Sequence, residues 1–427
     1  MLRLRVLAVI IGASGGIIGC GDNLGPCDGV VGTCIPVPSD ASANDAQRAL
    51  LEATPGSTVA FSAGTYHFKT GLSLDVPDVR IIGAGMERTV LSFAGQTDGA
   101  QGLLVTSDGF TLEDLAVEDT RGDGVKIEGA ERVVLRRTRV AWTGEPNATN
   151  GAYGLYPVQC KDVLIEDSFV RGASDAGIYV GQSENVVVRR NRAEDNVAGI
   201  EIENCIKADV YENTATSNTG GLLVFNLPGL QISNGSDTRV YRNQIFDNNT
   251  LNFAPPGNIV GVVPAGTGMV VLASHRAEVF DNDIHDHRTT NLGVISYLTL
   301  QIPISDPSYD PFPTALYFHD NRFSGVSSNP SGDLGAVILL SLAEINASGG
   351  GVPDFVWDGV VDPSRLVGGE YAAQDKLCFQ RNGDGDFISL NVPPGDAQLP
   401  VTDLAPLDCA HNALPPVTLG SLGRAAR

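Results

Sequence analysis

The chain has 427 residues and a formal net charge of −22, with 50 glycines, 24 prolines and 42% hydrophobic residues. This hydrophobic content excludes a globally disordered chain, and the many glycines and prolines favour short strands and turns over long helices. A surface this acidic repels polyanions, so we expect no nucleic-acid partner.

The N-terminal segment, residues 1–19, combines two arginines with a short apolar run. The run is too short and glycine-rich for a membrane span and is typical of a secretory signal peptide. Its end, Ile17-Ile18-Gly19-Cys20, resembles the lipobox of bacterial lipoproteins, which implies cleavage before Cys20 and lipid attachment to its thiol. We therefore expect residues 20–43 to be a tether at the bacterial periplasm or cell surface, with lipid as the only membrane contact. An ordinary signal peptide beside an incidental cysteine is the alternative.

A short amphipathic helix is predicted over residues 45–53, with Asn44 as its N-cap. Two short strand patterns follow, at residues 58–61 and 64–68. We expect the helix to cover the open edge of the strands that come after it.

A glycine-based unit then repeats, with steps of 22 or 23 residues and longer steps of 30 and 47. In each unit the residues one and three after the glycine are mostly apolar, which is the period-two pattern of a strand with one buried face. A second strand follows and ends at a polar residue, usually Asn. The unit glycines are Gly102, Gly124, Gly154, Gly177, Gly199, Gly221 and Gly268.

Units of this length, with Asn at a turn, predict an all-β chain wound as a right-handed parallel β-helix. The polar residues that end the second strands should stack as an internal ladder. They are Thr138, Ser168, Asn191, Asn213, Asn243, Asn282 and Asn321. We expect a single β-helix over residues 44–349, including its N-terminal helical cap, and an irregular C-terminal cap over residues 350–427.

The repeat resembles the right-handed β-helix superfamily of pectate lyases, alginate lyases and mannuronan epimerases. The run from Gly151 to Ala273 also resembles a secreted bacterial family of β-helix-repeat proteins. The resemblance implies the fold and leaves the reaction open, because this fold carries catalytic and non-catalytic proteins alike.

Six cysteines follow the lipobox cysteine, an even number in an oxidising compartment. Two disulfides are expected, Cys27 with Cys34 and Cys378 with Cys409. Cys160 and Cys205 occupy the same place in units two rungs apart, roughly 9.6 Å, which is too far for a disulfide. We expect both to be free thiols.

The residue two positions after each unit glycine points outward, so these side chains should form a strip along one face, about 4.8 Å apart. The candidate catalytic residues on this strip are Lys126, Tyr156, Tyr179 and Glu201. Candidate substrate-binding residues lie beside them: Gln159, Gln182, Glu203, Asn204 and Asn226. Tyrosine rings pack on sugars, amides and carboxylates bind hydroxyl groups, and shifted pKa values let Tyr and Lys transfer protons. Two insertions, residues 141–153 and 249–267, should wall the same face.

One segment tests the resemblance. Tyr153–Gln159 aligns with the Tyr-Gly-x-Asp-Pro-His-Glu segment of mannuronan C5-epimerases and related lyases. The Gly and Pro are kept, but Tyr156, Val158 and Gln159 stand where that family has Asp, His and Glu. The resemblance therefore implies a carbohydrate-active fold without the familiar epimerase set, and a Tyr/Lys-based elimination stays a hypothesis.

No metal and no cofactor are expected. His285 and His287 have a metal-like spacing but follow the turn residue Asn282, which indicates an ordinary rung. The segment Asn382–Asp386 is similar to a calcium loop but lacks the glycine and the distal Glu of an EF-hand, so Ca²⁺ bound in another geometry is the open alternative.

Two functions remain, both with a polysaccharide or oligosaccharide ligand. The first is an enzyme of lyase, epimerase or hydrolase type that uses the strip. The second is a non-catalytic lipoprotein that binds a glycan, or a protein partner of unknown identity, along the same face. An enzyme needs ionisable groups that converge on one substrate atom, whereas a binding protein needs only a continuous aromatic and amide strip.

Overall fold

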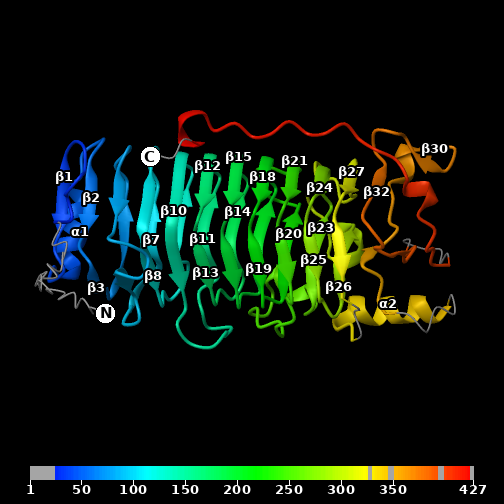
Figure 1. Ribbon diagram of the computed structural model, residues 1–427, viewed down its shortest axis with the longest axis horizontal. Coiled ribbons are helices and arrows are strands. Elements are labelled where there is room, and N and C mark those ends of the chain that lie inside the picture. Colours follow the sequence, from blue (N-terminus) through cyan, green and yellow to red (C-terminus); the bar gives the residue numbers. More distant parts are fainter. Residues whose placement is uncertain (1–24, 326–328, 345–350, 393–398, 424–427) are drawn as a thin grey trace, which may run out of the picture.

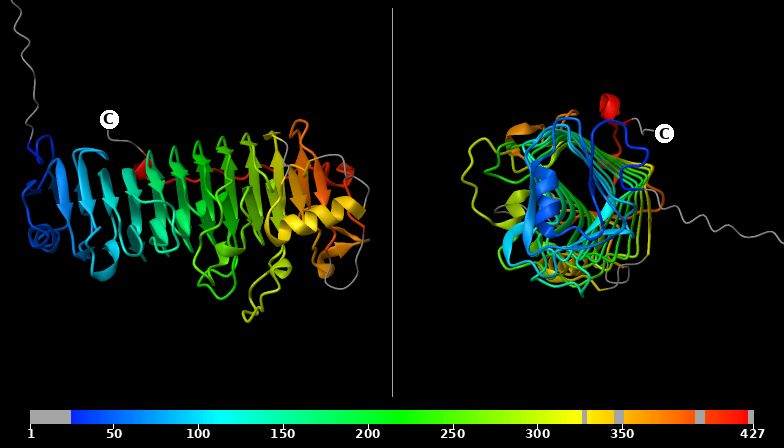
Figure 2. Two further views of the ribbon diagram at one scale, coloured as in Figure 1. Left: turned by 90° about the horizontal axis from the view of Figure 1, so that it is seen from below. Right: turned by 90° about the vertical axis from the view of Figure 1, so that its left-hand side faces the viewer.

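The computed structural model describes residues 25–325, 329–344, 351–392 and 399–423, and it shows an elongated right-handed parallel β-helix (Figure 1). The expected signal peptide and Cys20 lie outside these residues. Seen end-on, the coils stack with three flat faces around a closed interior (Figure 2). Among the described residues, no helix has the length and apolar content needed to cross a membrane.

The first face is an 11-stranded parallel sheet made of the first strand of each unit. Most of the unit glycines lie at the start of these strands: Gly124 directly precedes its strand, and Gly154, Gly177, Gly199, Gly221 and Gly268 are second in theirs, whereas Gly102 lies within its strand. The strands are β4 (Thr70–Leu74), β7 (Asp98–Val105), β9 (Val125–Glu128), β11 (Tyr153–Val158), β14 (Ala176–Gly181), β17 (Ala198–Glu203), β20 (Gly220–Phe225), β23 (Thr267–Leu272), β26 (Thr290–Ile295), β29 (Phe355–Trp357) and β33 (Phe387–Ser389).

The other two faces are joined through two long strands, β8 (Thr111–Glu118) and β10 (Glu131–Ala141). The second face contains β1 (Cys34–Val37), β2 (Thr58–Phe61), β5 (Arg80–Ile82), β12 (Lys161–Glu166), β15 (Glu184–Arg189), β18 (Ile206–Tyr211), β21 (Ser236–Tyr241), β24 (His275–Phe280), β27 (Leu316–His319) and β32 (Leu377–Gln380). The third contains β3 (Gly64–His67), β6 (Thr89–Ser92), β13 (Phe169–Arg171), β16 (Arg192–Glu194), β19 (Thr214–Thr216), β22 (Gln244–Phe246), β25 (Asp283–His285) and β28 (Arg322–Ser324).

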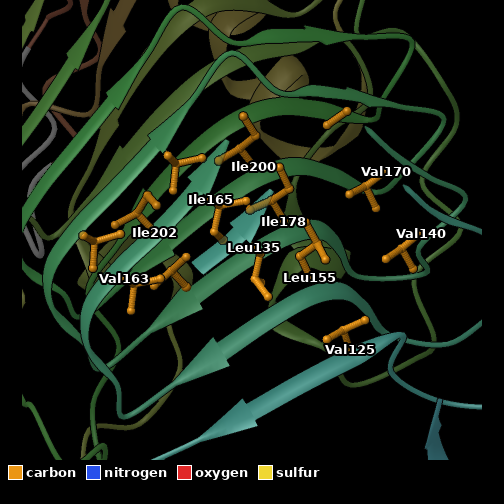
Figure 3. Packing of buried hydrophobic residues seen from close by; sticks show 14 of the residues in the cluster. Val125, Leu135, Val140, Leu155, Val163, Ile165, Val170, Ile178, Ile200 and Ile202 are labelled. Carbon is orange, nitrogen blue, oxygen red and sulfur yellow. The ribbon is translucent and has the colours of Figure 1, made fainter. Parts of the chain in front are cut away.

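The interior is a stack of aliphatic side chains from all three faces (Figure 3). Val125, Leu155, Ile178 and Ile200 from the first face follow one another from rung to rung, and each is fully buried. This continuous column removes apolar surface from water in every coil, which stabilises the coil against its neighbours.

The predicted internal ladder is confirmed. In each rung the Asn side-chain oxygen accepts the backbone N–H of the Asn in the preceding rung, as from Asn191 to Asn213 at 3.0 Å and from Asn213 to Asn243 at 3.0 Å. The side-chain NH₂ bonds the next Asn and a backbone carbonyl. The ladder ends at Asn382, so the segment proposed as a calcium loop begins with a structural rung residue.

A second internal ladder, which the sequence analysis missed, runs through Asn196, Asn218 and Asn248 and ends at His287. The His287 ring nitrogens lie 3.0 Å from the Asn248 amide and 2.7 Å from the Asn291 oxygen, and burial lowers the pKa of the ring to about 4. His287 is therefore a neutral ladder residue, and the His-x-His spacing has a structural cause.

The N-terminal cap is present but begins earlier than predicted. Helix α1 spans Ala43–Leu51, and its N-cap is Ser42 rather than Asn44. Ser42 and Asp45 form a capping box, each side chain bonding the other's backbone N–H. The reciprocal bonds fix the helix start two residues before the start that Asn44 would have capped, and Leu50 packs into the core of the first coils.

The stacking continues past the expected boundary at residue 349, because β29 and β33 extend the first face and β32 extends the second. Helix α2 (Gly332–Glu344) packs Ile338 and Leu342 on the outer side of these coils. The remaining elements are a small antiparallel pair, β30 (Leu366–Val367) with β31 (Glu370–Tyr371), and the short 3-10 turns η1 (Ile259–Val262), η2 (Tyr297–Leu300), η3 (Pro363–Arg365), η4 (Ala405–Leu407) and η5 (Gly420–Gly423).

The cysteine predictions for the described residues are confirmed. Cys27 bonds Cys34 with 5.9 Å between Cα atoms, and Cys378 bonds Cys409 with 4.9 Å between Cα atoms. Cys160 and Cys205 are buried free thiols whose sulfur atoms contact backbone carbonyls.

Candidate functional site

The predicted strip forms on the outer side of the first face. Tyr156 lies opposite Lys126, and Tyr179 lies opposite Glu201. The pairing of Leu155 with Ile178 places Tyr156 and Tyr179 on adjacent rungs. The repeat therefore predicted correctly which side chains share this column.

The strip is not an open surface along its whole length, and this corrects the expectation of a walled but exposed face. Tyr179 is 5% exposed and Glu201 is 1% exposed. Beyond Glu201 the column becomes apolar at Leu223, and Val260 and Val263 of the second insertion pack against this apolar patch. The insertion therefore covers this part of the face instead of only bordering it. Its two valines and the apolar patch beneath them are both removed from water by this packing.

Three carboxyl groups gather under this insertion: Asp175, Glu201 and Glu203. All three residues are less than 10% exposed. Tyr179 donates its hydroxyl to Glu203 Oε1 at 2.5 Å, and Asn258 of the insertion donates its amide to Asp175 Oδ2 at 2.9 Å. Glu201 Oε2 is buried with no hydrogen-bond partner. Without a cation to balance them, such groups favour the protonated form.

The pKa values follow this geometry. Burial, assisted by the nearby charge of Glu203, raises the pKa of Asp175 to about 7. Burial raises the pKa of Glu203 to about 7 against the opposing hydrogen bond from Tyr179. Burial and the two neighbouring carboxylates raise the pKa of Glu201 well above its ordinary value. At neutral pH the cluster therefore holds protons that it can donate and has carboxylates that can accept them.

Three tyrosine rings lie against the cluster. The ring of Tyr153 is 4.4 Å from that of Tyr156 and 4.6 Å from that of Tyr179, centre to centre. Burial raises the pKa of all three hydroxyl groups above the ordinary tyrosine value. They stay protonated at neutral pH and act as hydrogen-bond donors, which argues against the Tyr-based elimination considered from the sequence.

Gly181 leaves the space that the Tyr179 side chain needs to reach Glu203. It lies opposite Glu203, and a Cβ atom at this position would come within 2.2 Å of the Tyr179 hydroxyl. The absence of a side chain lets the phenol lie across Gly181 and reach the carboxyl of the next rung.

Lys126 stands at the accessible end of the strip. Its ammonium group is 3.1 Å from Glu128 and 5.4 Å from the centre of the Tyr156 ring. Asp123 is the next acidic group, and burial raises its pKa as well. Lys126, which is already paired with Glu128, thus faces a site rich in carboxyl groups. This excess of acidic over basic groups disfavours an anionic ligand.

The predicted substrate-binding residues divide into two groups. Asn204 and Asn226 are buried and hold the segment between β20 and β21: Asn204 bonds Leu227 and Ile232, and Asn226 bonds Gly235. Their side chains are not available to a ligand, so these two predictions are wrong. Gln182 accepts the backbone N–H of Gln231, and Gln159 is exposed.

Backbone conformation explains why polar residues recur at this turn. Gln159, Gln182 and Asn204 have φ angles of 55°, 50° and 47°. Amide side chains tolerate this left-handed region better than branched apolar ones. The series that resembled a row of ligand-binding amides is therefore a series of turn residues.

Sequence reasoning missed Asp175, Tyr153 and Asn258. One signal for Asp175 was present, because the equivalent position two before the unit glycine holds Ala152, Val197 and Thr219 in neighbouring units. No comparable signal existed for Asn258, which reaches Asp175 from 83 residues away.

A separate cavity of ≈ 680 Å³ lies between β24, β27 and the C-terminal segment. His275 lines it, with Nδ1 at 2.9 Å from the Thr314 hydroxyl and Nε2 at 4.0 Å from Asp310. Arg365 pairs with the same Asp310. Burial lowers the pKa of His275, and its Nε2 atom is buried without a hydrogen-bond partner among the described residues, whereas Asp310 is paired with Arg365.

A resident metal ion does not fit the residues described. Across the described ranges, no three His, Cys, Asp or Glu side chains are grouped to hold one. Asn382 is a ladder residue, and Asp386 accepts the backbone N–H of Asp354.

The comparisons with known proteins agree with this architecture. A family model described as a right-handed beta helix region matches residues 101–227. The A-module of the Azotobacter vinelandii mannuronan C-5 epimerase AlgE4 is similar in structure, with a TM-score of 0.51, 19% identity, and coverage of 79% of this chain and 88% of that chain.

Two further structures are less similar. They are the A-module of AlgE6 from Azotobacter vinelandii (TM-score 0.46, 18% identity, 67% of this chain and 84% of that chain) and an alginate lyase from a Paenibacillus species (TM-score 0.40, 18% identity, 60% and 89%). No curated protein matches the sequence. At these identities the likeness shows the fold alone, a right-handed parallel β-helix.

Proposed function

We propose that this protein processes an uncharged polysaccharide at the outer side of its first face, with Asp175, Glu201 and Glu203 as the proton-transferring groups. The observation that carries the proposal is the cluster of three buried carboxyl groups, in which burial raises the pKa values of Asp175 and Glu203 to about 7 and that of Glu201 well above its ordinary value. Perturbed carboxyl groups of this kind are typical of catalytic acids and bases. The β-helix shared with a mannuronan epimerase module supports a carbohydrate ligand at the level of the fold.

Hydrolysis fits the site better than elimination. Glu201 and Glu203 are alternate residues of one strand and point to the same side, so their Cα atoms are about 6.6 Å apart. A protonated carboxyl and a nearby carboxylate are the acid and base that glycoside hydrolysis needs. Elimination or epimerisation at a uronate also needs its carboxylate neutralised, and Lys126, paired with Glu128, is poorly placed to do this among so many acids.

The ligand is expected to approach from the Lys126–Tyr156 end, where the side chains are half-buried. The rings of Tyr153 and Tyr156 offer an aromatic surface against which a sugar can pack. Reaching Glu201 requires the second insertion, residues 249–267, to move, and the bond from Asn258 to Asp175 is a polar contact of this insertion with the cluster. Substrate binding would replace that contact.

The test is an NMR time course of neutral and uronic glycans with the full chain, comparing wild type with Glu203→Gln. We expect new reducing-end signals from a neutral glycan, and a loss of rate of about a hundredfold or more in the variant, since the amide cannot transfer a proton. Glu184→Gln, an exposed change on the second face, is the matched control and should keep full rate. Product from a uronate alone, or an unchanged rate in Glu203→Gln, would contradict the proposal.

Non-catalytic glycan binding is the second candidate, and the burial of Tyr179 and Glu201 favours it. In the same experiment it predicts broadened glycan signals without new ones, and equal broadening with Glu203→Gln. Loss of broadening in Tyr156→Ala would then place the ligand on the accessible tyrosines.

We further propose that the protein is a lipoprotein of the bacterial periplasm or cell surface. The support is the lipobox-like sequence ending at Cys20. Mass spectrometry of the N-terminal peptide from membrane fractions should show acyl chains on Cys20, and an unmodified peptide in the soluble fraction would contradict this.

A further inference from the structure

The C-terminal segment, residues 411–422, forms an extended strap on the outside of the β-helix. In Figure 1 it is the red segment that runs back from the last coils toward β10, across the strands of the second face. The disulfide from Cys378 in β32 to Cys409 fixes the point where the strap begins. The strap is thus an extended peptide lying on a surface made by distant parts of the chain.

The surface under the strap is one column of outward side chains, which we name the track. Strand pairing places one residue of each rung in register along it. The track residues are Val134, Leu164, Val187, Asp209, Arg239 and Glu278. It is apolar at the β10 end and charged at the β24 end.

At its charged end the track binds the strap through backbone N–H groups. Leu414 donates to Glu278 Oε2 at 2.9 Å, and Val417 donates to Asp209 Oδ2 at 3.2 Å. The two carboxylates are two rungs apart, roughly 9.6 Å. Three residues of a polyproline-type chain span about 9.3 Å, so the spacing of the peptide matches that of the rungs.

The residues between the two donors are Pro415 and Pro416, which have no N–H. Every backbone donor of the Leu-Pro-Pro-Val stretch is therefore paired with a track carboxylate. A peptide with other residues in place of Pro415 and Pro416 would have two more backbone N–H groups, and these two carboxylates would not accept a hydrogen bond from either of them. The track accordingly selects for an apolar-Pro-Pro-apolar segment.

At its apolar end the track receives side chains. Val417, Leu419 and Leu422 pack against the cluster of Val134, Leu164 and Val187. The strap carries no acidic residue, whereas Asp209 and Glu278 are each less than 5% exposed beneath it. Arg239 lies between these two carboxylates, 3.0 Å from Asp209 and 3.8 Å from Glu278, so the pair can remain buried under an uncharged peptide.

The strap itself is held by few contacts. Between the anchoring positions its residues are exposed to solvent: Asn412, Ala413, Pro415, Pro416, Thr418 and Gly420. Besides two backbone bonds to the track and a short apolar contact, one bond holds the start of the strap, 2.8 Å between His411 Nε2 and the Lys376 carbonyl. We expect a segment with so few buried contacts to open more readily than the coils.

We propose that the track is a recognition site for extended apolar-Pro-Pro-apolar segments of a partner polypeptide, and that the strap fills it until such a segment displaces it. The proposal is independent of the carbohydrate function, since the track lies on the second face and the carboxyl cluster on the first. The partner segment is uncharged or basic, because an acidic one would face Asp209 and Glu278.

The test uses the full chain and a fluorescein-labelled synthetic peptide of residues 410–423, followed by fluorescence anisotropy. In the wild type the tethered strap competes at high effective concentration. The variant Val417→Asp/Leu419→Asp weakens the strap by placing carboxylates against Leu164 and Val187. We expect it to bind the peptide at least about tenfold more tightly than the wild type does.

Three comparisons make the result specific. Adding Val187→Asp to that variant should abolish binding, while circular dichroism confirms that both chains are folded. A peptide with P415A/P416A should bind at least about tenfold more weakly. A peptide that keeps only Leu-Pro-Pro-Val, Leu419 and Leu422, with serine and alanine elsewhere, should bind as well as the original.

No binding to the folded strap-weakened chain would overturn the proposal. So would equal binding of the P415A/P416A peptide, which would show that the prolines are not recognised. Failure of the simplified peptide would show that the track accepts only the chain's own strap, which would then be a structural element and not a placeholder for a partner.

Discussion

Replacing Asn213 with alanine is expected to lower the free energy of unfolding by about 3 kcal/mol or more. The change leaves the Asn191 N–H, the Val188 carbonyl and one lone pair of Asn243 without their partners inside the coil. Each buried polar group left unpaired costs about 1–3 kcal/mol, and Asn213 is only 1% exposed. Chemical denaturation followed by circular dichroism measures the loss.

Asn44→Ala is the matched control. Asn44 is exposed on helix α1, and Ser42 supplies the cap. We expect its stability to stay within about 0.5 kcal/mol of wild type. If Asn213→Ala were no more destabilised than Asn44→Ala, the ladder would be a by-product of stacking and not a source of stability.

Glu201→Gln is expected to make the protein more stable at pH 8 and to flatten its pH dependence. The pKa values of Asp175, Glu201 and Glu203 are raised above their ordinary values of 3.8, 4.5 and 4.5, so the folded state holds protons that the unfolded state has lost. The stability that these groups contribute is therefore complete in acid and declines as the pH rises from about 4 through 7. The amide removes one buried acid and its repulsion with the other two.

Thermal unfolding of wild type and Glu201→Gln at pH 5 and pH 8 measures this effect. The difference between the two proteins should exceed about 1 kcal/mol at pH 8 and shrink toward pH 5. Glu184→Gln, exposed on β15, should follow the wild type at both pH values. The opposite result would be a wild type that becomes more stable than Glu201→Gln as the pH rises from 5 to 8. It would show that the carboxyl groups are ionised and stabilising, and it would contradict the expectation that burial keeps them protonated.

Much of the fold was predictable because the sequence repeats it. The 22-residue interval between Gly177 and Gly199 gives the register that the structure shows, with Tyr179 opposite Glu201. The first ladder could be predicted from the Asn residues that recur at the end of the second strand of each unit. The second ladder was missed because its last member is His287, which pairs with an amide as Asn does but looks like a metal ligand in the sequence.

The candidate site was predictable only in part, because burial depends on what covers a face. The repeat showed that Tyr179 and Glu201 leave the coil interior, but not that Tyr179 is buried in one apolar cluster with Val260 and Val263. Asn258 reaches Asp175 across 83 residues of sequence. The position of the strap could not be predicted either. The bond from Val417 to Asp209 joins residues 208 positions apart, and no repeat in the sequence indicates it.

The most direct test of the proposed site is a titration of its carboxyl groups by ¹³C NMR, with labelled glutamate and aspartate. Spectra of wild type, Glu201→Gln and Glu203→Gln between pH 4 and pH 9 identify the signals that belong to the cluster. We expect these signals to report protonated carboxyl groups still at pH 6, and we expect removal of either glutamate to lower the pKa of the remaining groups. Cluster signals that are fully ionised by pH 5 in all three proteins would contradict it, because no proton donor would then be present at neutral pH.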